Sequence, residues 1–259
     1  IHEVIDSGVV PLLIQILESS LDSRIQCEAA WCLSNLCAGT SEDTERMIDQ
    51  GVIPNFISAL KSLDEEVIEQ CLWGLGNIAG DSAKFRDLVI KAGAVDPMVK
   101  VLESATSLSM ESTGIWSLLN MCRGKPAPPY TAIEKTIPVF CNYLKNEDDP
   151  EILANVIWGL SCSSDRDEGI VAILENDINS QLVNLLDDPS IFIITLCLRV
   201  IGNITAGTDE QAARFLQEKE FFPNLLKLIN HEQDEIKRGT LWILTNITAG
   251  PQVQFESMM

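Results

Sequence analysis

Tryptophan and asparagine recur together along this 259-residue sequence at a nearly constant spacing. Successive tryptophans are 42, 43, 42 and 84 residues apart, and the last gap is twice 42 because Arg199 stands where a sixth would fall. The tryptophans are Trp31, Trp73, Trp116, Trp158 and Trp242. Four residues after these six positions come Asn35, Asn77, Asn120, Cys162, Asn203 and Asn246. We call these six pairs the Trp/Asn ladder.

The ladder residues have the chemistry needed to hold an extended basic peptide. A carboxamide both donates and accepts hydrogen bonds, so a row of asparagines can bind a peptide main chain without reading its sequence. An indole face attracts a cation by about 0.5–2 kcal/mol, which suits slots between tryptophans to the side chains of lysine and arginine. The ladder therefore predicts a binding surface for Lys/Arg-rich segments.

Charge favours the same kind of partner. The chain has 38 Asp plus Glu against 18 Lys plus Arg, a net charge of −20, which repels nucleic acid and anionic membranes. In addition, no apolar run is long enough to span a bilayer. From the charge and this absence together, we expect neither nucleic acid nor a membrane as partner. Asp81, in the turn after Asn77, is the best acceptor for a ligand ammonium. The alternatives are that the acidity only maintains solubility and that Asp81 is only a turn residue.

Residues for catalysis or metal binding do not form a pattern. The eight cysteines include no Cys-x-x-Cys pair, and the only histidines are His2 and His231. Cys27, Cys71 and Cys197 fall on apolar helix stripes, where cysteine acts as a small hydrophobe in a reducing cytosol or nucleus. No Ser/His/Asp set or phosphate-binding loop is present. We expect no metal, no cofactor, no catalytic residue and no enzyme activity.

Helices must carry the ladder. Turns of small residues precede a proline in DSGVVP, DQGVIP and KAGAVDP, and each proline fits the first turn of a helix. The series is Pro11, Pro54, Pro97, Pro138 and Pro223, with Gln181 in the remaining repeat. A second helix, such as CEAAWCLSNL, carries the Trp/Asn pair, and clusters such as AGTSED and AGDS end it. A helical unit of about 42 residues is typical of armadillo or HEAT repeats.

The ladder helices have two separate stripes. Ala29, Leu33 and Leu36 form an apolar stripe, as do Cys71, Leu75 and Ile78, and then Thr240, Leu244 and Ile247. The tryptophans share a different stripe with Glu28 and Asn35, with Gln70 and Asn77, and with Gly239 and Asn246. Unpaired amides in a core cost about 1–3 kcal/mol each, so we place the ladder outside the core.

Such repeats stack into one continuous core. We therefore expect an all-α fold, a right-handed superhelical solenoid of armadillo repeats, in which residues 1–259 form a single domain. A partial first repeat precedes about six more, and residues 123–130 (RGKPAPPY) are a long turn within the array.

Several segments resemble the importin α (karyopherin α) family of nuclear import adaptors. They are EAAWCLSNLCAGTSEDT, LWGLGNIAGDS, RGKPAPPY, LRVIGNITAGTDEQ and LWILTNITAG. The resemblance implies an armadillo solenoid that binds nuclear localisation signals of cargo proteins and shuttles between cytoplasm and nucleus. It also implies that the chain is a fragment, without the family's importin-β-binding segment and last repeats. Importin β would then bind the full-length protein through a segment absent here.

The resemblance assigns two peptide sites. The major site comprises Trp31, Asn35, Gly39, Thr44, Gln70, Trp73, Asn77, Asp81, Trp116 and Asn120. In the family, a glycine carbonyl, a threonine hydroxyl and an aspartate form its lysine pocket, which matches Gly39, Thr44 and Asp81. The minor site is partial and comprises Arg199, Asn203, Trp242 and Asn246.

Five positions depart from the family pattern: Thr113, Asn155, Cys162, Ala212 and Gly239. They leave the lysine pocket intact but weaken the far end of the major site and impair the minor site. Two alternatives therefore stay open. One is an armadillo scaffold of the catenin kind, and the other is an importin-α relative that binds other peptide ligands.

Overall fold

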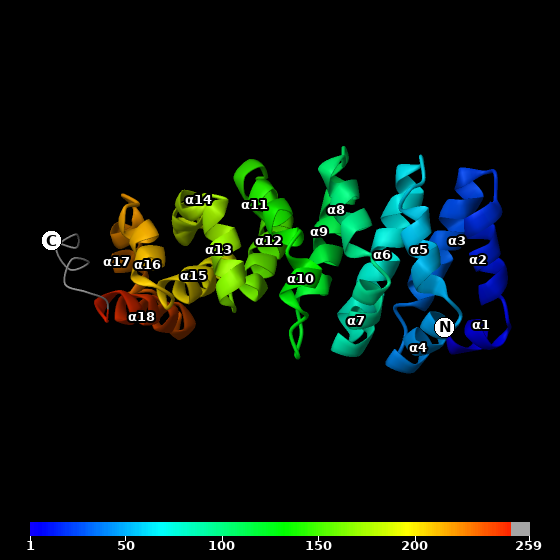
Figure 1. Ribbon diagram of the computed structural model, residues 1–259, viewed down its shortest axis with the longest axis horizontal. Helices are drawn as coiled ribbons and strands as arrows, with labels where there is room; N and C mark the ends of the chain where they lie inside the picture. The colour runs from blue at the N-terminus through cyan, green and yellow to red at the C-terminus, as the bar shows by residue number, and fades with distance from the viewer. Residues whose placement is uncertain (250–259) are drawn as a thin grey trace. The chain divides into compact units, whose positions relative to one another are not determined.

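The computed structural model describes residues 1–249, which form helices and turns without a β-strand in that range. The helices group into six sets of three, and each set is one repeat (Figure 1). The expected all-α fold is confirmed, but each repeat has three helices where the sequence pattern alone defined two.

The third helix of each repeat carries the ladder. These helices are α3 (Ser23–Leu36), α6 (Glu65–Asp81), α9 (Leu108–Cys122), α12 (Pro150–Ser163), α15 (Ile191–Thr205) and α18 (Asp234–Thr248). The second helices are α2 (Val10–Ser19), α5 (Val52–Ala59), α8 (Val95–Glu103), α11 (Thr136–Asn146), α14 (Asn179–Asn184) with the 3₁₀ turn η1 (Leu185–Asp187), and α17 (Phe221–Leu228).

The short first helices are α1 (His2–Asp6), α4 (Ser41–Asp49), α7 (Ala83–Lys91), α10 (Tyr130–Ile133), α13 (Asp167–Glu175) and α16 (Asp209–Leu216). The AGTSED cluster that ends α3 also begins α4, because Thr40 and Asp43 form a reciprocal capping box. Thr208 and Gln211 do the same for α16. Polar clusters that signal only the end of one helix therefore also start the next.

The turn before the second helix has a left-handed residue in four repeats. Gly8, Gly51 and Gly93 have φ values of 77°, 86° and 84°, and Asp177 takes this place with φ 48°. The five prolines of the repeat series lie in the first turn of α2, α5, α8, α11 and α17, as the sequence predicts.

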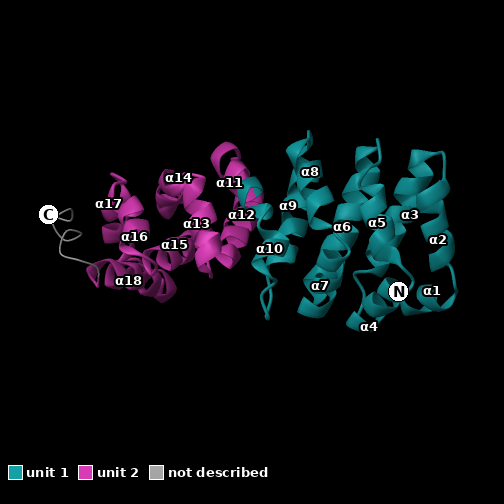
Figure 2. Ribbon diagram, viewed as in Figure 1, with its two compact units in different colours: residues 1–139 teal, residues 140–259 magenta. Residues whose placement is uncertain are grey.

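The chain divides into two compact units, residues 1–139 and 140–259, with the boundary inside α11 (Figure 2). In unit 1, α6 packs against both α3 and α9, and in unit 2, α15 packs against both α12 and α18. The expectation of one continuous solenoid over residues 1–259 stays a prediction.

The predicted core stripes are buried with one exception. The stripes of α3 and α6 are at most 5% exposed. In α18, Leu244 is only half-buried and Ile243 takes its place in the core, on a stripe with Ile236, Thr240 and Ile247. Cys71 and Cys197 are buried as expected, whereas Cys27 is half-buried, and all eight cysteines are free thiols.

Residues 123–129 form the expected long turn, and the buried side chain of Arg86 on α7 holds it. The Arg86 guanidinium donates to the carbonyl oxygens of Arg123 at 2.7 Å and Pro126 at 2.8 Å. It also pairs with Asp87 at 2.7 Å, although its own side chain is only 1% exposed. The turn thus depends on one side chain for part of its backbone hydrogen bonding.

We predict that Arg86→Leu lowers the free energy of unfolding of the chain by about 2–4 kcal/mol, because two turn carbonyls lose a charged donor. Urea denaturation followed by circular dichroism measures this loss. Arg24→Leu is the matched control, since Arg24 also pairs with an aspartate, Asp22, but is exposed. Equal effects of both substitutions would contradict the assigned role of Arg86.

Candidate peptide-binding surface

Unit 1 places its ladder tryptophans at the surface to different degrees. Trp31 on α3 is 49% exposed and Trp73 on α6 is 41% exposed, whereas Trp116 on α9 is half-buried. The prediction that the indoles lie outside the core is confirmed for Trp31 and Trp73. Because α6 packs against both other helices, the three rings follow one stripe across adjacent repeats.

Glycine lets the Trp116 ring lie directly against the preceding repeat. A Cβ atom on Gly76 would lie 2.4 Å from the Trp116 ring, so the indole lies against the α6 backbone where only glycine leaves room. Unit 2 repeats this contact, because a Cβ atom on Gly202 would lie 2.2 Å from the ring of Trp242, which is 41% exposed. The backbone of the preceding repeat thus contacts the rings of Trp116 and Trp242.

Three ladder asparagines tie their repeat to a backbone carbonyl of the repeat before it. The Nδ2 group of Asn77 donates to the Ser34 carbonyl at 3.1 Å. Asn120 donates to the Gly76 carbonyl and Asn246 to the Gly202 carbonyl, also at 3.1 Å. Each acceptor is the residue directly before the ladder asparagine position of the preceding repeat. One N–H of each amide is therefore already used within the protein.

Exposure of the amides differs along unit 1. Asn35 is exposed, Asn77 is half-buried and Asn120 is fully buried. The Asn120 amide lies beside Gly80 together with the Arg123 guanidinium, and its Oδ1 atom has no hydrogen-bond partner among residues 1–249. The exposed amide that the sequence predicts at Asn120 is therefore not found.

The expected lysine pocket lies where the α3–α4 turn meets the end of α6. Asp81 is the last residue of α6, rather than part of a turn, and is exposed. Both of its carboxylate oxygens accept from the Ser41 hydroxyl at 3.0 Å. Gly39 is half-buried, and Thr44 is fully buried with its hydroxyl donating to the Cys37 carbonyl at 3.2 Å. We call Gly39, Ser41, Thr44 and Asp81 the Asp81 slot.

Ser41 was not predicted from the sequence. It lies 40 residues before Asp81 and carries no local signal of that contact. Gln70, which was predicted, is half-buried, and its Oε1 atom is buried without a hydrogen-bond partner among the described residues.

Carboxylates gather at the N-terminal ends of α3 and α6. Burial, and then the nearby carboxylates, raise the pKa of the half-buried Cys27 thiol. The carboxylates are Glu66, Asp64, Glu28 and Glu69. Negative charge is thus concentrated on the helices that carry Trp31 and Trp73, which favours a cationic ligand.

Unit 2 has a different arrangement. Arg199, in the vacant tryptophan position, pairs with Asp165 at 2.9 Å. Asn203 donates to the same carboxylate at 3.0 Å and to the Ser164 hydroxyl at 2.9 Å. The Asp165 carboxylate near this part of the ladder therefore already binds a cation, Arg199, and an amide, Asn203, of the protein itself. Asp165 was not predicted as part of the site.

The positions that depart from the family pattern are mostly covered. Ala212 is only 3% exposed, and Gly239 is half-buried with space for a Cβ atom limited by Leu198 at 3.2 Å. The other three, Thr113, Asn155 and Cys162, are half-buried.

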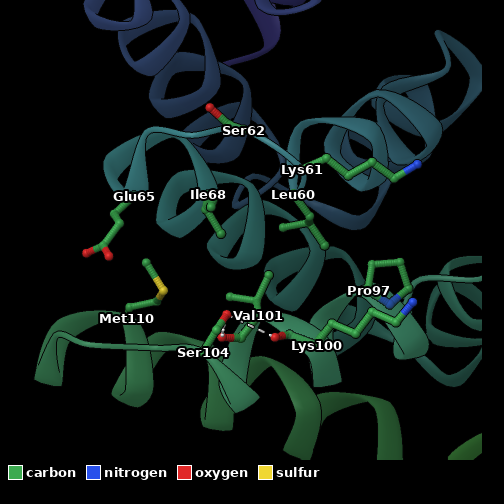
Figure 3. A pocket seen from close by; sticks show the side chains of 10 residues that line it. All are labelled: Leu60, Lys61, Ser62, Glu65, Ile68, Pro97, Lys100, Val101, Ser104 and Met110. Carbon is green, nitrogen blue, oxygen red and sulfur yellow. Dashed lines mark hydrogen bonds between the residues drawn. The ribbon is translucent and has the colours of Figure 1, made fainter.

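The cleft shown in Figure 3 is separate from the ladder. It has a volume of about 320 Å³ and is lined by Leu60, Lys61, Ser62, Glu65, Ile68, Pro97, Lys100, Val101, Ser104 and Met110. Its α6 residues, Glu65 and Ile68, precede Trp73 of the ladder by eight and five positions, roughly 12 Å and 8 Å along the helix axis. Within residues 1–249, no helix has the length and apolarity to cross a membrane, and no group of three or more His, Cys, Asp or Glu side chains is placed to hold a metal ion.

Comparison with known proteins first identifies the fold. Residues 1–38 and 40–80 match the family model "Armadillo/beta-catenin-like repeat". A designed armadillo repeat protein in complex with the peptide (KR)4 superposes with a TM-score of 0.79 at 26% identity, covering 92% of this chain and 98% of that chain. The chain is an all-α armadillo solenoid.

Relatives then identify the family. The chain is similar to importin subunit alpha-1a of Oryza sativa subsp. japonica, with 39% identity over 100% of this chain and 49% of the relative. Importin subunit alpha-1b of the same organism is 37% identical over 93% of this chain and 45% of its own length. Armadillo repeats together with 37–39% identity support an importin-α armadillo region, and the chain spans about half the length of these curated relatives.

We predict that Asn77→Ala lowers the free energy of unfolding by about 0.5–1.5 kcal/mol, because the hydrogen bond to the preceding repeat is lost. Asn35→Ala is the control, since the Asn35 side chain is exposed and forms no hydrogen bond within residues 1–249. Denaturant titration of both variants measures the difference. A larger loss from Asn35→Ala would show that the cross-repeat bond does not stabilise unit 1.

Proposed function

We propose that the chain is the cargo-binding part of a nuclear import adaptor and that unit 1 holds Lys/Arg-rich nuclear localisation signals as extended peptides. The observation that carries this proposal is the Asp81 slot. Its carboxylate is exposed and accepts only from the Ser41 hydroxyl among residues 1–249, so no internal cation occupies it. The similarity to importin α subunits and to a designed protein solved with (KR)4 supports a basic ligand.

Each group in unit 1 has a distinct role in this proposal. A ligand lysine reaches Asp81 while its aliphatic stem lies along exposed indole surface of Trp31 or Trp73. Its ammonium replaces the Ser41 hydroxyl as donor or shares the carboxylate with it. The Gly39 carbonyl and the Thr44 hydroxyl oxygen are the remaining acceptors, and the Thr44 oxygen can accept while its hydrogen is donated to the Cys37 carbonyl.

The amides contribute according to their exposure. Asn35 and Asn77 contact the peptide main chain directly, and the half-buried Gln70 adds a third amide beside them. Asn120 instead acts as a positioning residue, because its bond to the Gly76 carbonyl fixes the strip of backbone on which the Trp116 ring lies. In the proposed major site, Asn120 thus changes from a ligand contact to a positioning residue, and Ser41 is added.

In unit 2 we propose a weaker contribution from Arg199, Asn203, Trp242 and Asn246. The Arg199–Asp165 pair removes one acceptor for a ligand cation, and Asn246 is tied to the Gly202 carbonyl. We further propose that the whole protein shuttles between cytoplasm and nucleus without enzymatic activity, and that importin β binds it through a segment outside this chain.

A second candidate function has one specific observation in its favour. The carboxylate of Asp165 is already paired, so unit 2 is not arranged as a second pocket for lysine. The second candidate is an importin-α relative whose ligands differ from ordinary nuclear localisation signals. Selection from a random peptide library distinguishes the two, because enrichment of sequences without clustered Lys or Arg would favour the second candidate.

We predict that Asp81→Lys weakens binding of a short Lys-rich peptide by about 1–3 kcal/mol, between the values for an exposed and a buried charge pair. The substitution removes the acceptor and places a like charge in the slot. Trp242→Ala is the comparison and should change the affinity much less. Isothermal titration of both variants with one peptide is the measurement. Unchanged affinity in Asp81→Lys would overturn the assignment of the major site.

We also predict that raising the ionic strength weakens peptide binding, mainly by slowing association. The net charge of −20 steers a basic peptide, and screening shortens the range of that attraction to about 8 Å at physiological salt. Stopped-flow fluorescence at several salt concentrations separates the association and dissociation rate constants. Rates independent of salt would argue against acidic steering.

A further inference from the structure

Two pairs of side chains join α12 and the turn after it to α15 on the ladder face of unit 2. Trp158 contacts Phe192, with ring centroids 6.1 Å apart and planes at 87°. Asp165 follows Trp158 by seven residues, and Arg199 follows Phe192 by seven residues. These two charged side chains also form a pair. Residues seven apart on α15 lie on the same face of the helix, roughly 10 Å apart along its axis. The two pairs are therefore neighbours on one surface.

Phe192 of this pair is open to solvent, whereas Trp158 is half-buried. Phe192 is 50% exposed and its neighbour Ile191 is 46% exposed, although both begin a helix whose other apolar residues are buried. Two rings at right angles form a corner that presents the face of one ring and the edge of the other. We call Trp158, Phe192 and Ile191 the aromatic corner.

The Asp165 carboxylate of the charged pair, by contrast, already accepts hydrogen bonds from within the protein. Arg199 lies 2.9 Å and Asn203 3.0 Å from the Asp165 carboxylate, which therefore has both a cation and an amide donor. Asp81 in unit 1 has only a hydroxyl donor within the described residues. The two units thus offer a ligand different chemistry, an open carboxylate in unit 1 and a neutralised carboxylate beside an exposed ring in unit 2.

We propose that the aromatic corner binds an uncharged apolar or aromatic side chain of the peptide ligand and that Arg199 keeps lysine and arginine away from Asp165. This inference rests on the proposed function, because it assumes that an extended peptide follows the ladder. The occupant is a peptide segment in which a bulky apolar residue accompanies the basic cluster. The neutralised carboxylate beside the corner favours an uncharged neighbour at that point of the ligand.

A positional scan tests this proposal. The probes are fluorescent peptides with one five-residue Lys/Arg cluster and a Gly/Ser tail on either side, in which a single Phe, Lys or Ala is moved along the tail. Anisotropy titrations with the purified chain should find a tail position where Phe binds about three- to tenfold more tightly than Ala. Lys at the tail positions should give no gain over Ala.

Variants assign the gain to the corner. Phe192→Ser should abolish the advantage of Phe over Ala, whereas Leu226→Ser, which removes a 67% exposed leucine from α17, should preserve it. Arg199→Ala should release Asp165 and give Lys an advantage of about two- to fivefold at a neighbouring tail position.

The outcomes separate the inference from the function on which it rests. Peptides that bind through the basic cluster but never gain from Phe would overturn the inference and leave the proposed function intact. A Phe gain that persists in Phe192→Ser would also overturn it. Failure of every peptide to bind would overturn both.

Discussion

The contact on which the arrangement of the surface depends is the hydrogen bond from a ladder asparagine to a backbone carbonyl of the preceding repeat. Apolar burial holds the repeats together, but it is not directional and leaves neighbouring helices free to slide. A bond of 3.1 Å from Asn77 to Ser34, Asn120 to Gly76 or Asn246 to Gly202 fixes the offset of one third helix against the next. The spacing of the tryptophans at the surface follows from that offset.

Glycine at the acceptor position connects this bond to the indole rings. Gly76 and Gly202 each expose a carbonyl to an asparagine and a bare Cα to a tryptophan of the following repeat. A side chain at either position would push the ring away from the helix. The first junction has Ser34 as acceptor instead. Asparagine, glycine and tryptophan therefore act as one unit at two of these junctions.

Net acidity alone does not define where a cation binds. Asp81 and Asp165 are both exposed carboxylates near ladder helices, yet only Asp165 is paired with an arginine of the chain. The difference depends on Arg199, which replaces a tryptophan in the repeat. Arginine in place of tryptophan at this ladder position thus removes an indole ring and adds a cation. As a result, the adjacent Asp165 carboxylate is already neutralised before a ligand binds.

The sequence by itself determined the features that repeat. The period near 42, the prolines in first turns and the separate stripes for Leu33 and Trp31 follow from helical geometry, so the all-α repeat fold and the surface position of Trp31 and Trp73 could be predicted. The ladder residues could be listed for the same reason, because spacing of three and four places side chains on one helix face.

Tertiary structure decided what depends on neighbouring repeats. The contact of Ser41 with Asp81, the pairing of Arg199 with Asp165 and the contact of Phe192 with Trp158 join residues 34 to 40 positions apart, and no local pattern encodes them. Burial of Asn120 has the same origin, since Gly80 and Arg123 surround its amide only after the repeats pack. Periodicity assigns a side chain to a face, but the next repeat determines whether that side chain remains available to a ligand.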